Sequence, residues 1–363
     1  MPEKKTATTQ RFVSRGNFAV MPLSFPGVTV PVDPDESHVT SLDVSADGRL
    51  VVGGTSGARA HLFAAFPKPP AGLVMDLGAI DGATETRAVA ARGGRVFAAV
   101  NGPDGGRLVT QWLPWAVDGI QEWSTWRPPL SALAALPDER ILDLYVAPDA
   151  KLACCLTSRR VVRVRMDDVV TEMTRDNLSV TFGARDVEDI ADAAVRGPAV
   201  SRFAVAPDAL YAPLEGRMLS RIDPDARAAD VTGVELPFER GWGWAHMRDG
   251  RHLAAAEDGR LVAFDPAHAR AAPAGRAPLG PVTCMAAGAD GTVYGLCAEG
   301  IGRMFAYDPG RREATDLGAV AGVLGTKRYA YTFADAVTGR DGEIYFAEND
   351  RGGHLWVYFP PVA

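Results

Sequence analysis

Short apolar runs recur along the whole chain, each ended by a tight-turn dipeptide and followed at once by another apolar run. The dipeptides are Asp47-Gly48, Gly93-Gly94, Asp149-Ala150, Asp208-Ala209, Asp249-Gly250, Asp290-Gly291 and Asp341-Gly342. Asp-Gly between such runs indicates a β-hairpin, because both residues tolerate positive φ. Successive turns lie 46, 56, 59, 41, 41 and 51 residues apart, and a four-stranded propeller blade takes roughly 40 to 50 residues. The pattern therefore predicts an all-β fold, a seven-bladed β-propeller.

The third and fourth strands of the repeat also have recurring sequences. The third strand ends at Asp-Pro in 219–224, 261–266 and 304–309, and proline ends a strand because it has no N–H to donate. The fourth strand recurs as 76–80 and 316–320. The last repeat has no fourth strand, and a spare apolar stretch, 18–32, precedes the first repeat. We expect this stretch to be the outer strand of the last blade and to close the ring; an ordered tail packed elsewhere is the alternative.

A single domain over residues 1–363 is predicted, with a flexible N-terminal tail at 1–17. The two longest steps between turns predict loop insertions at 114–139 and 167–199, and long loops in compact folds are often functional. The first insertion contains Trp115, whose ring is suited either to the core or to stacking on a sugar or aromatic ligand. The second contains a predicted helix at 187–196, before Gly197-Pro198. Both insertions are expected to wall the mouth of the channel.

Composition and charge narrow the classes of partner. Gly and Pro are plentiful, at 38 and 26 residues, as many tight turns require. The net charge is −7 and the Arg residues are scattered, which argues against a nucleic acid partner. No apolar run reaches the roughly 18 residues of a membrane helix, and no apolar core follows the N-terminal charges as in a secretory signal. A cytoplasmic monomer without a membrane partner is expected.

The four cysteines are typical of a reducing compartment. If Asp290-Gly291 forms a two-residue turn, Cys284 and Cys297 lie opposite each other on paired strands. Opposed residues there are close enough to form a disulfide. Two packed thiols and a disulfide both remain open.

Aligned on their turns, the innermost strands present a polar position followed by an apolar one. The polar position reads Ser41, Arg87, Asp143, Arg202, Gly243, Cys284 and Asp335. The apolar position reads Leu42, Ala88, Leu144, Phe203, Trp244, Met285 and Ala336. Side chains alternate along a strand, so the apolar set should pack between blades and the polar set should face the channel. Arg87, Asp143 and Arg202 then form either a clamp for a carboxylate or phosphate or a charge-balanced ring.

Four consecutive second strands end in Glu, and an Arg follows each: Glu215 and Arg217, Glu257 and Arg260, Glu299 and Arg303, Glu348 and Arg351. The repeated pair is interpreted first as an ion pair that shapes each turn. Glu348 has the most polar neighbours of the four. It is alternatively a substrate contact, a base or a metal ligand.

The loops that lead into the innermost strands carry the candidate catalytic residues. Tyr331 and His38 border adjacent blades, and with Asp335 they could form an acid–base group. Trp242, Arg328 and Tyr329 lie in equivalent loops and are candidate substrate contacts. The alternative is that these residues only cover the end of the channel. His246 falls in an apolar position and is expected in the core.

The repeats Asp341–Glu348 and Asp290–Cys297 resemble the blades of streptogramin-lyase-like and related seven-bladed propellers. In that family a His and a Glu near a magnesium ion carry an elimination. The resemblance implies Glu348 as the counterpart of that Glu and identifies no counterpart of the His. Otherwise no cofactor is indicated, and a divalent metal is left open. No P-loop, G-x-S-x-G elbow, EF-hand or H-x-x-x-H motif occurs in the sequence.

These features predict a propeller that binds a small molecule or an oligosaccharide at the mouth of its channel. The enzymatic hypothesis is an eliminative carbon–oxygen lyase acting on an acidic oligosaccharide or another small acidic substrate. The alternatives are a non-catalytic carbohydrate or small-molecule binder and a protein-interaction scaffold. The lyase hypothesis requires Arg87, Arg202, Tyr331 and His38 to share one pocket.

Overall fold

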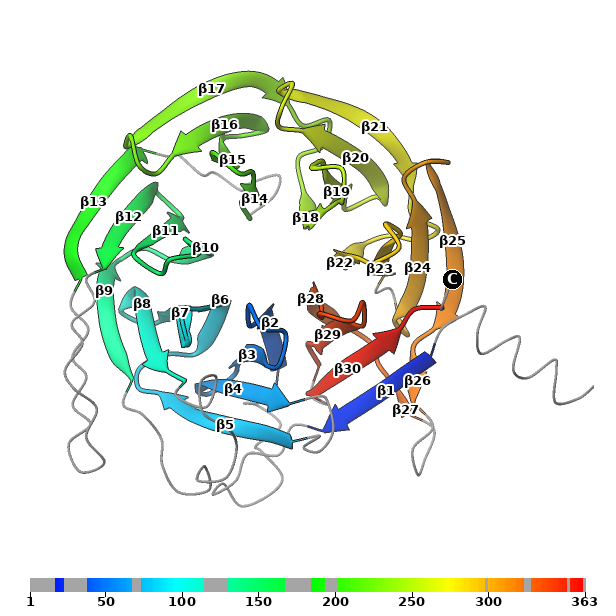
Figure 1. The fold of residues 1–363 in the computed structure, drawn as a ribbon, viewed down its shortest axis with the longest axis horizontal. Helices are drawn as coiled ribbons and strands as arrows, with labels where there is room; N and C mark the ends of the chain where they lie inside the picture. Colours follow the sequence, from blue (N-terminus) through cyan, green and yellow to red (C-terminus); the bar gives the residue numbers. More distant parts are fainter. Residues whose placement is uncertain are drawn as a thin grey trace, which may run out of the picture.

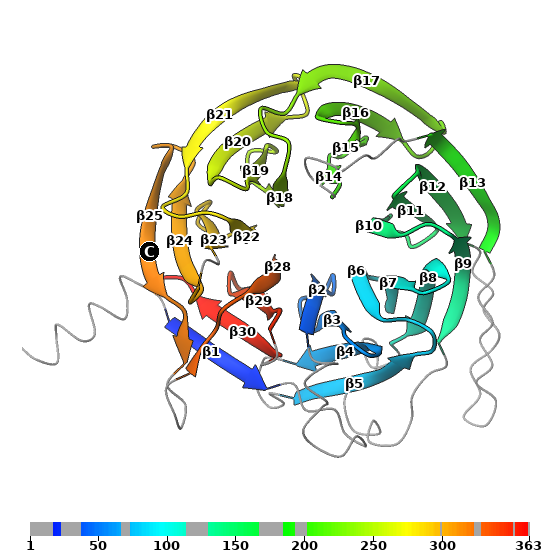
Figure 2. The same ribbon diagram turned by 180° about the vertical axis from the view of Figure 1, so that it is seen from behind.

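The computed structural model describes residues 17–22, 38–66, 73–113, 130–166, 184–192, 202–297, 300–322, 328–350 and 353–361. In these ranges the chain is all-β, and its sheets stand around a central axis like the blades of a propeller (Figure 1). The reverse view shows the same ring from its other face (Figure 2). None of the described residues belong to a helix with the length and apolar character needed to cross a membrane.

Five of the sheets in the described part have four antiparallel strands each. One contains both ends of the chain, in the order β1 (Asn17–Pro22), β30 (His354–Phe359), β29 (Ile344–Glu348) and β28 (Phe333–Thr338). The next two are β10 (Ile141–Val146), β11 (Leu152–Thr157), β12 (Arg160–Met166), β13 (Ala184–Asp192), and β14 (Ala204–Val205), β15 (Leu210–Glu215), β16 (Met218–Asp223), β17 (Ala228–Glu235). The last two are β18 (Gly241–His246), β19 (His252–Ala256), β20 (Arg260–Asp265), β21 (Arg270–Arg276), and β22 (Val282–Ala287), β23 (Val293–Cys297), β24 (Arg303–Asp308), β25 (Glu313–Ala319).

The remaining strands form an eight-stranded curled sheet and a two-stranded sheet. The first half of the large sheet is β2 (His38–Val44), β3 (Val51–Ser56), β4 (Ala60–Phe66) and β5 (Leu73–Ile80). Its second half is β6 (Glu85–Arg92), β7 (Arg95–Gly102), β8 (Gly105–Trp112) and β9 (Ser131–Pro137). The halves meet at one residue pair, Ser56 with Glu85. The small sheet pairs β26 (Ala321–Gly322) with β27 (Arg328–Tyr329).

The N-terminal strand pairs with the C-terminal one. β1 lies antiparallel to β30 over six residue pairs, from Asn17 with Phe359 to Pro22 with His354. The remainder of the apolar stretch, 23–32, lies outside the described residues, as do residues 1–16 of the predicted tail. Asn17, the last residue of that predicted tail, already belongs to β1.

The apolar core lies between neighbouring sheets. Seven clusters of buried apolar residues are found in the described part, and each joins side chains of adjacent sheets or of the two halves of the large sheet. Phe97 and Cys155 share one such cluster, and Phe305 and Leu253 share another. This packing confirms the burial expected of the apolar position for five of its seven residues, Leu42, Ala88, Leu144, Phe203 and Met285, whereas Trp244 and Ala336 are only partly buried.

The hairpin loops differ from the two-residue turns that the sequence suggested. Only Gly93-Gly94 is flanked directly by paired residues, Arg92 and Arg95, among the described hairpins between innermost and second strands. The other loops are longer, and in all of them except the Asp208-Ala209 loop the Gly or Ala after the Asp is left-handed, as at Gly291 (φ 87°). The carboxylates of Asp47, Asp149, Asp249 and Asp290 also accept the N–H two residues on, at 3.0 Å from Thr292 in the case of Asp290. The Asp-Gly dipeptide therefore closes a wider loop than a two-residue turn.

A β-bulge recurs in the innermost strands. The pairing of β2, β6, β10, β18, β22 and β28 with the second strand slips by one residue in mid-strand. The residues passed over are Thr40, Arg87, Leu142, Gly243, Thr283 and Ala334. Such bulges bend a strand and redirect its side chains. Arg87 and Gly243 are thus bulge residues, whereas Asp143 and Asp335 each follow a bulge residue. The residues of the predicted polar position therefore do not occupy equivalent places in their strands.

Two further expectations are wrong: that Cys284 lies opposite Cys297, and that 187–196 is a helix. Cys284 pairs with Leu296 because the hairpin loop spans 288–292 rather than two residues, and beyond the bulge at Thr283 Cys297 pairs with Val282. Cys284 and Cys297 are accordingly both free, buried thiols. The predicted helix at 187–196 is also wrong, because residues 184–192 form β13, which pairs along β12.

The predicted insertions therefore contribute the outer strands of two sheets, β9 and β13. Trp115 and the rest of 114–129 lie outside the described residues. The Asp-Pro ends of β16, β20 and β24 are confirmed. The Asp at each end accepts backbone N–H groups of the following turn, as Asp308 does from Gly310 at 2.8 Å.

Removal of β1 should expose the edge of β30. Deleting residues 1–22 is expected to lower Tm by about 5 °C or more, since it removes a whole strand ladder, and to promote self-association through the open edge. Deleting only residues 1–16 is the matched control and should change neither property. Calorimetry and light scattering measure both, and equal behaviour of the two deletions would contradict a structural role for β1.

Candidate functional site

The centre of the ring is crossed by an ion pair. Arg202, just before β14, donates from Nη1 to Oδ1 of Asp335 in β28 at 2.6 Å. The other carboxylate oxygen, Oδ2, accepts the backbone N–H of Leu42 in β2 at 2.9 Å. The Asp335 side chain is only 8% exposed and that of Arg202 28%. Asp335 therefore serves as a structural anion that joins three innermost strands, and the acid–base role expected for it is not favoured.

Asp143 in β10 makes the same kind of bond to the backbone of the following innermost segment. Its Oδ2 accepts the backbone N–H of Phe203 at 2.7 Å, as Asp335 accepts that of Leu42. Burial raises the pKa of Asp143 to about 6, although the positive charge of Arg202 and the N–H of Phe203 act in the opposite direction. This carboxyl thus titrates near neutral pH inside the channel.

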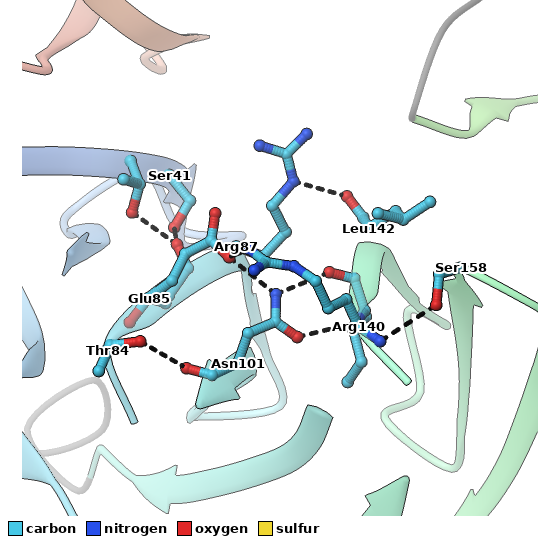
Figure 3. A network of polar contacts seen from close by, with 11 residues as sticks. Ser41, Thr84, Glu85, Arg87, Asn101, Arg140, Leu142 and Ser158 are labelled. Atoms are coloured by element: carbon cyan, nitrogen blue, oxygen red, sulfur yellow. Dashed lines mark hydrogen bonds and ion pairs between the residues drawn. The ribbon is translucent and has the colours of Figure 1, made fainter. Parts of the chain in front are cut away.

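Arg87 reaches into the channel from the bulge of β6. Its Nε donates to the carbonyl oxygen of Leu142 in β10 at 3.0 Å, and its guanidinium extends beyond that bond (Figure 3). Burial and the charge of Arg202 both lower the pKa of Arg87, while Glu85, Asp143 and Asp335 raise it. For Arg202 burial also lowers the pKa, but Asp335 and Asp143 outweigh it, and the net shift is upward. The positive charges of the two guanidinium groups therefore repel each other. The nearby carboxylates offset this effect on the pKa of Arg202 but not on that of Arg87.

A polar network holds the strand that bears Arg87. Asn101 Nδ2 donates to Glu85 and to the carbonyl oxygen of Ile141, both at 2.9 Å, and its Oδ1 accepts the N–H of Ile141 at 2.8 Å. Arg140 completes the network through an ion pair of 2.6 Å with Glu85 (Figure 3). The side chain of Asn101 thus substitutes for strand pairing between β7 and β10, at the start of the strand that contains Asp143 and beside the strand that bears Arg87.

His38 and Tyr331 flank one segment, as expected of residues on adjacent blades. His38 Nδ1 lies 3.4 Å from the carbonyl oxygen of Asn349, and the Tyr331 N–H donates to Asp350 at 3.2 Å. Tyr331 is 50% exposed and His38 is partly buried. Tyr329 is also partly buried, and Arg328 belongs to β27 with its side chain outside the described part. No hydrogen bond or ion pair within the described residues joins His38 or Tyr331 to Asp335.

Glu348 is a buried structural group. It is 1% exposed, and its Oε2 lies 2.5 Å from Nδ1 of His354 and accepts the N–H of His354 at 3.0 Å. The expected Glu–Arg pairs are wrong for two of the turns, because Arg217 pairs with Glu235 and Arg260 with Asp258. Arg303 pairs with Asp316, while Glu299 and Arg351 lie outside the described residues. The carboxylates that pair with these arginines thus lie elsewhere in the turns and outer strands.

Trp242 is partly buried beside the central ion pair. It lines a very small cavity, about 10 Å³, together with Arg202, Cys284 and Ala334. A larger cavity of about 500 Å³ lies further along the axis, where the innermost strands end, and the sequence did not indicate it. Its wall includes Asp43, Arg92 and His246, and His246 is exposed there rather than buried in the core.

The described residues contain no group of three or more His, Cys, Asp or Glu side chains placed to hold a metal ion. Comparison with protein-family models found no family that matches the chain. Comparison with curated proteins likewise found no match.

The Arg202–Asp335 pair should behave as a stability element. Arg202→Gln leaves the buried Asp335 carboxylate without its cation and is expected to cost roughly 2 kcal/mol of unfolding free energy, less than a fully buried pair would. The double variant R202Q/D335N removes both charges and should recover most of the loss. Urea unfolding of the wild type, Arg202→Gln, Asp335→Asn and the double variant measures this, and additive losses would show that the two groups are not coupled.

Proposed function

We propose that this chain is a seven-bladed β-propeller, closed by β1, that binds a small acidic ligand in its channel between Arg87 and Arg202. Two observations support the blade count. The eight-stranded sheet divides into two sets of four strands that share only the Ser56–Glu85 pair, and seven core clusters lie between neighbours in the described part. The pairing of β1 with β30 supports closure.

The observation that carries the ligand proposal is the charge arrangement around Arg87. Its pKa is lowered by burial and by the positive charge of Arg202, so its charged form is destabilised. A carboxylate or phosphate placed between the two guanidinium groups would relieve that repulsion and accept their planar N–H donors. Arg87 is also held in place by its bond to Leu142. A small acid or an acidic sugar is therefore the class of ligand favoured, and a monomeric, cytoplasmic protein stays a prediction of the sequence.

Galacturonate, compared with the neutral sugar galactose, tests this charge requirement. Calorimetric titration at pH 7 should detect galacturonate only, and Arg87→Gln should weaken its binding about tenfold or more, as expected for a lost charge-assisted pair. The matched control is Arg221→Gln, which removes a partly exposed arginine of β16 that pairs with Asp208. Equal binding of the two sugars, or wild-type affinity in Arg87→Gln, would refute the proposal.

The affinity should also depend on pH through Asp143. Its pKa of about 6 means that lowering the pH from 7 to 5 protonates it and removes a negative charge beside the two arginines. The ligand carboxylate stays ionised over this range, so binding should tighten as the pH falls. Asp143→Asn should bind tightly at pH 7 and lose this dependence; an unchanged pH profile would assign the titration to another group.

An eliminative lyase is the second candidate, favoured by the contact of both His38 and Tyr331 with the Asn349–Asp350 segment. In such a reaction a base removes the proton on the carbon next to the carboxylate, the carbon–oxygen bond at the next carbon breaks, a double bond forms between the two carbons, and the departing oxygen takes up a proton to leave as a hydroxyl group. Incubation with polygalacturonate, with and without Mg²⁺, would reveal the unsaturated product by its ultraviolet absorbance. Tyr331→Phe should then lower kcat about 100-fold with little change in galacturonate affinity. Binding without any product would identify a non-catalytic propeller.

A further inference from the structure

The cavity at the hairpin end of the channel is separate from the site proposed above. Its lining comes from β2, β6, β18, β22 and β28 at the ends where those strands run into their hairpin loops. The loop face, where the sequence placed the site, is at the opposite ends of the same strands. A volume of about 500 Å³ falls within the range of roughly 300–1,000 Å³ that small-molecule pockets occupy.

The central charges separate the two ends. Asp335 and Cys284 immediately precede the residues of β28 and β22 that line the cavity, Ala336 and Met285. Trp244 and Met285 border both the 500 Å³ cavity and the very small space that contains Arg202. The Arg202–Asp335 pair therefore lies at the inner end of the cavity, and a ligand there would enter from the hairpin side.

Arg92 presents an oriented cation to the cavity. Its Nη1 donates to Asp43 Oδ2 and to the carbonyl oxygen of Ala91, both at 2.8 Å. The same Asp43 oxygen accepts the N–H of Ala91 at 2.8 Å, so the carboxylate is itself held by the backbone. Among the described residues all hydrogen bonds of the Arg92 guanidinium use Nη1, and 31% of the side chain is exposed. The edge formed by Nε and Nη2 is thus available to bind a carboxylate through two parallel bonds.

The other charged and titratable groups of the wall favour an anion. Arg340 follows β28 and lies at the rim, where its Nη1 donates to the carbonyl oxygen of Asp47 at 3.2 Å. Asp43 is the acidic side chain of the lining, and it is already paired with Arg92. Two arginines against one aspartate leave one positive charge in the wall.

An apolar wall faces these charges. The Trp244 indole is fixed by its Nε1 bond to the carbonyl oxygen of Arg202 at 3.0 Å and packs edge-on against His252, with ring centroids 6.1 Å apart. Met285 and Val337 extend this wall on the neighbouring strands. A ligand body that lies here would be aromatic or aliphatic rather than a polyhydroxylated sugar.

We propose that this cavity is a second binding site, specific for a small organic acid with one carboxylate and an apolar or aromatic body. The carboxylate binds the free edge of Arg92, with Arg340 adding charge at the rim. The body packs on Trp244 and Met285. This site differs from the channel site between Arg87 and Arg202 both in its position and in its preference for an apolar ligand.

Benzoate and its neutral counterpart benzamide are probes of this site. Calorimetric titration of the full chain should show benzoate binding at least about tenfold more tightly than benzamide, because only benzoate can form the charge-assisted pair. Arg92→Gln should remove this preference, Arg340→Gln should weaken benzoate binding by a smaller factor, and Arg221→Gln should match the wild type. The double variant D43N/R92Q removes both charges of the pair and gives the same test if Arg92→Gln alone, with Asp43 unpaired, fails to fold.

Tryptophan fluorescence locates the bound probe. Benzoate should change the emission of the wild type, and Trp244→Phe should retain binding but lose that change. Equal binding of benzamide and benzoate, or wild-type affinity in both Arg92→Gln and D43N/R92Q, would overturn the proposal. Benzoate binding that is lost in Arg87→Gln but kept in Arg92→Gln would also overturn it, and would place the anion at the channel site instead. If benzoate binds but galacturonate does not, only the function proposed for the channel site between Arg87 and Arg202 would be overturned.

Discussion

The innermost strands are held to one another by side chains that bind the backbone of the next strand. Adjacent sheets of a propeller share no strand ladder, so polar backbone groups at the axis need other partners. Asp335, Asp143 and Asp43 supply them, each accepting an N–H from the innermost strand that follows, at Leu42, Phe203 and Ala91. Thr338 makes a comparable bond to the carbonyl oxygen of Ala287, and Trp244 to that of Arg202. The axial carboxylates are therefore first of all fasteners between sheets.

That constraint also creates the electrostatics of the channel. The backbone N–H groups hold each carboxylate in a fixed position, and the arginines lie around these fixed negative charges. Arg202 binds Asp335 on a distant strand of the ring, and Arg92 binds Asp43 on an adjacent one. Arg87, whose Nε bonds a carbonyl oxygen instead, has its pKa lowered. Strand β6 thus carries two different arginines: Arg92, whose charge is paired with Asp43, and Arg87, whose pKa is lowered.

The sequence predicted the parts of this fold that depend on local chemistry. Strand ends at Asp-Pro were confirmed, and so was burial at five of the seven apolar positions, because proline geometry and side-chain alternation act within a few residues. The pairing register of the innermost strands was not predictable, since a bulge at Thr283 or Arg87 adds one residue without any marker in the amino-acid sequence. The Arg202–Asp335 pair joins residues 133 positions apart, and only the arrangement of the sheets around a common axis brings them together. β13 was mistaken for a helix because Val187, Ile190 and Ala191 also fit a helical period, and pairing with β12 decides between the two.

Placement of both proposed sites on one axis has a consequence for how they interact. Each lies against a different side of the layer that contains Arg202 and Asp335, and Trp244 contacts the backbone of Arg202 from the hairpin side. An anion near Arg87 would compete for the charge that Arg202 now shares with Asp335 and Asp143. Any shift of Arg202 would be transmitted to the Trp244 indole through the bond to its carbonyl oxygen, and thereby to the apolar wall of the cavity. Because such coupling is reciprocal, a body packed on Trp244 would in turn bias the position of Arg202 and the affinity of the opposite end for an acid.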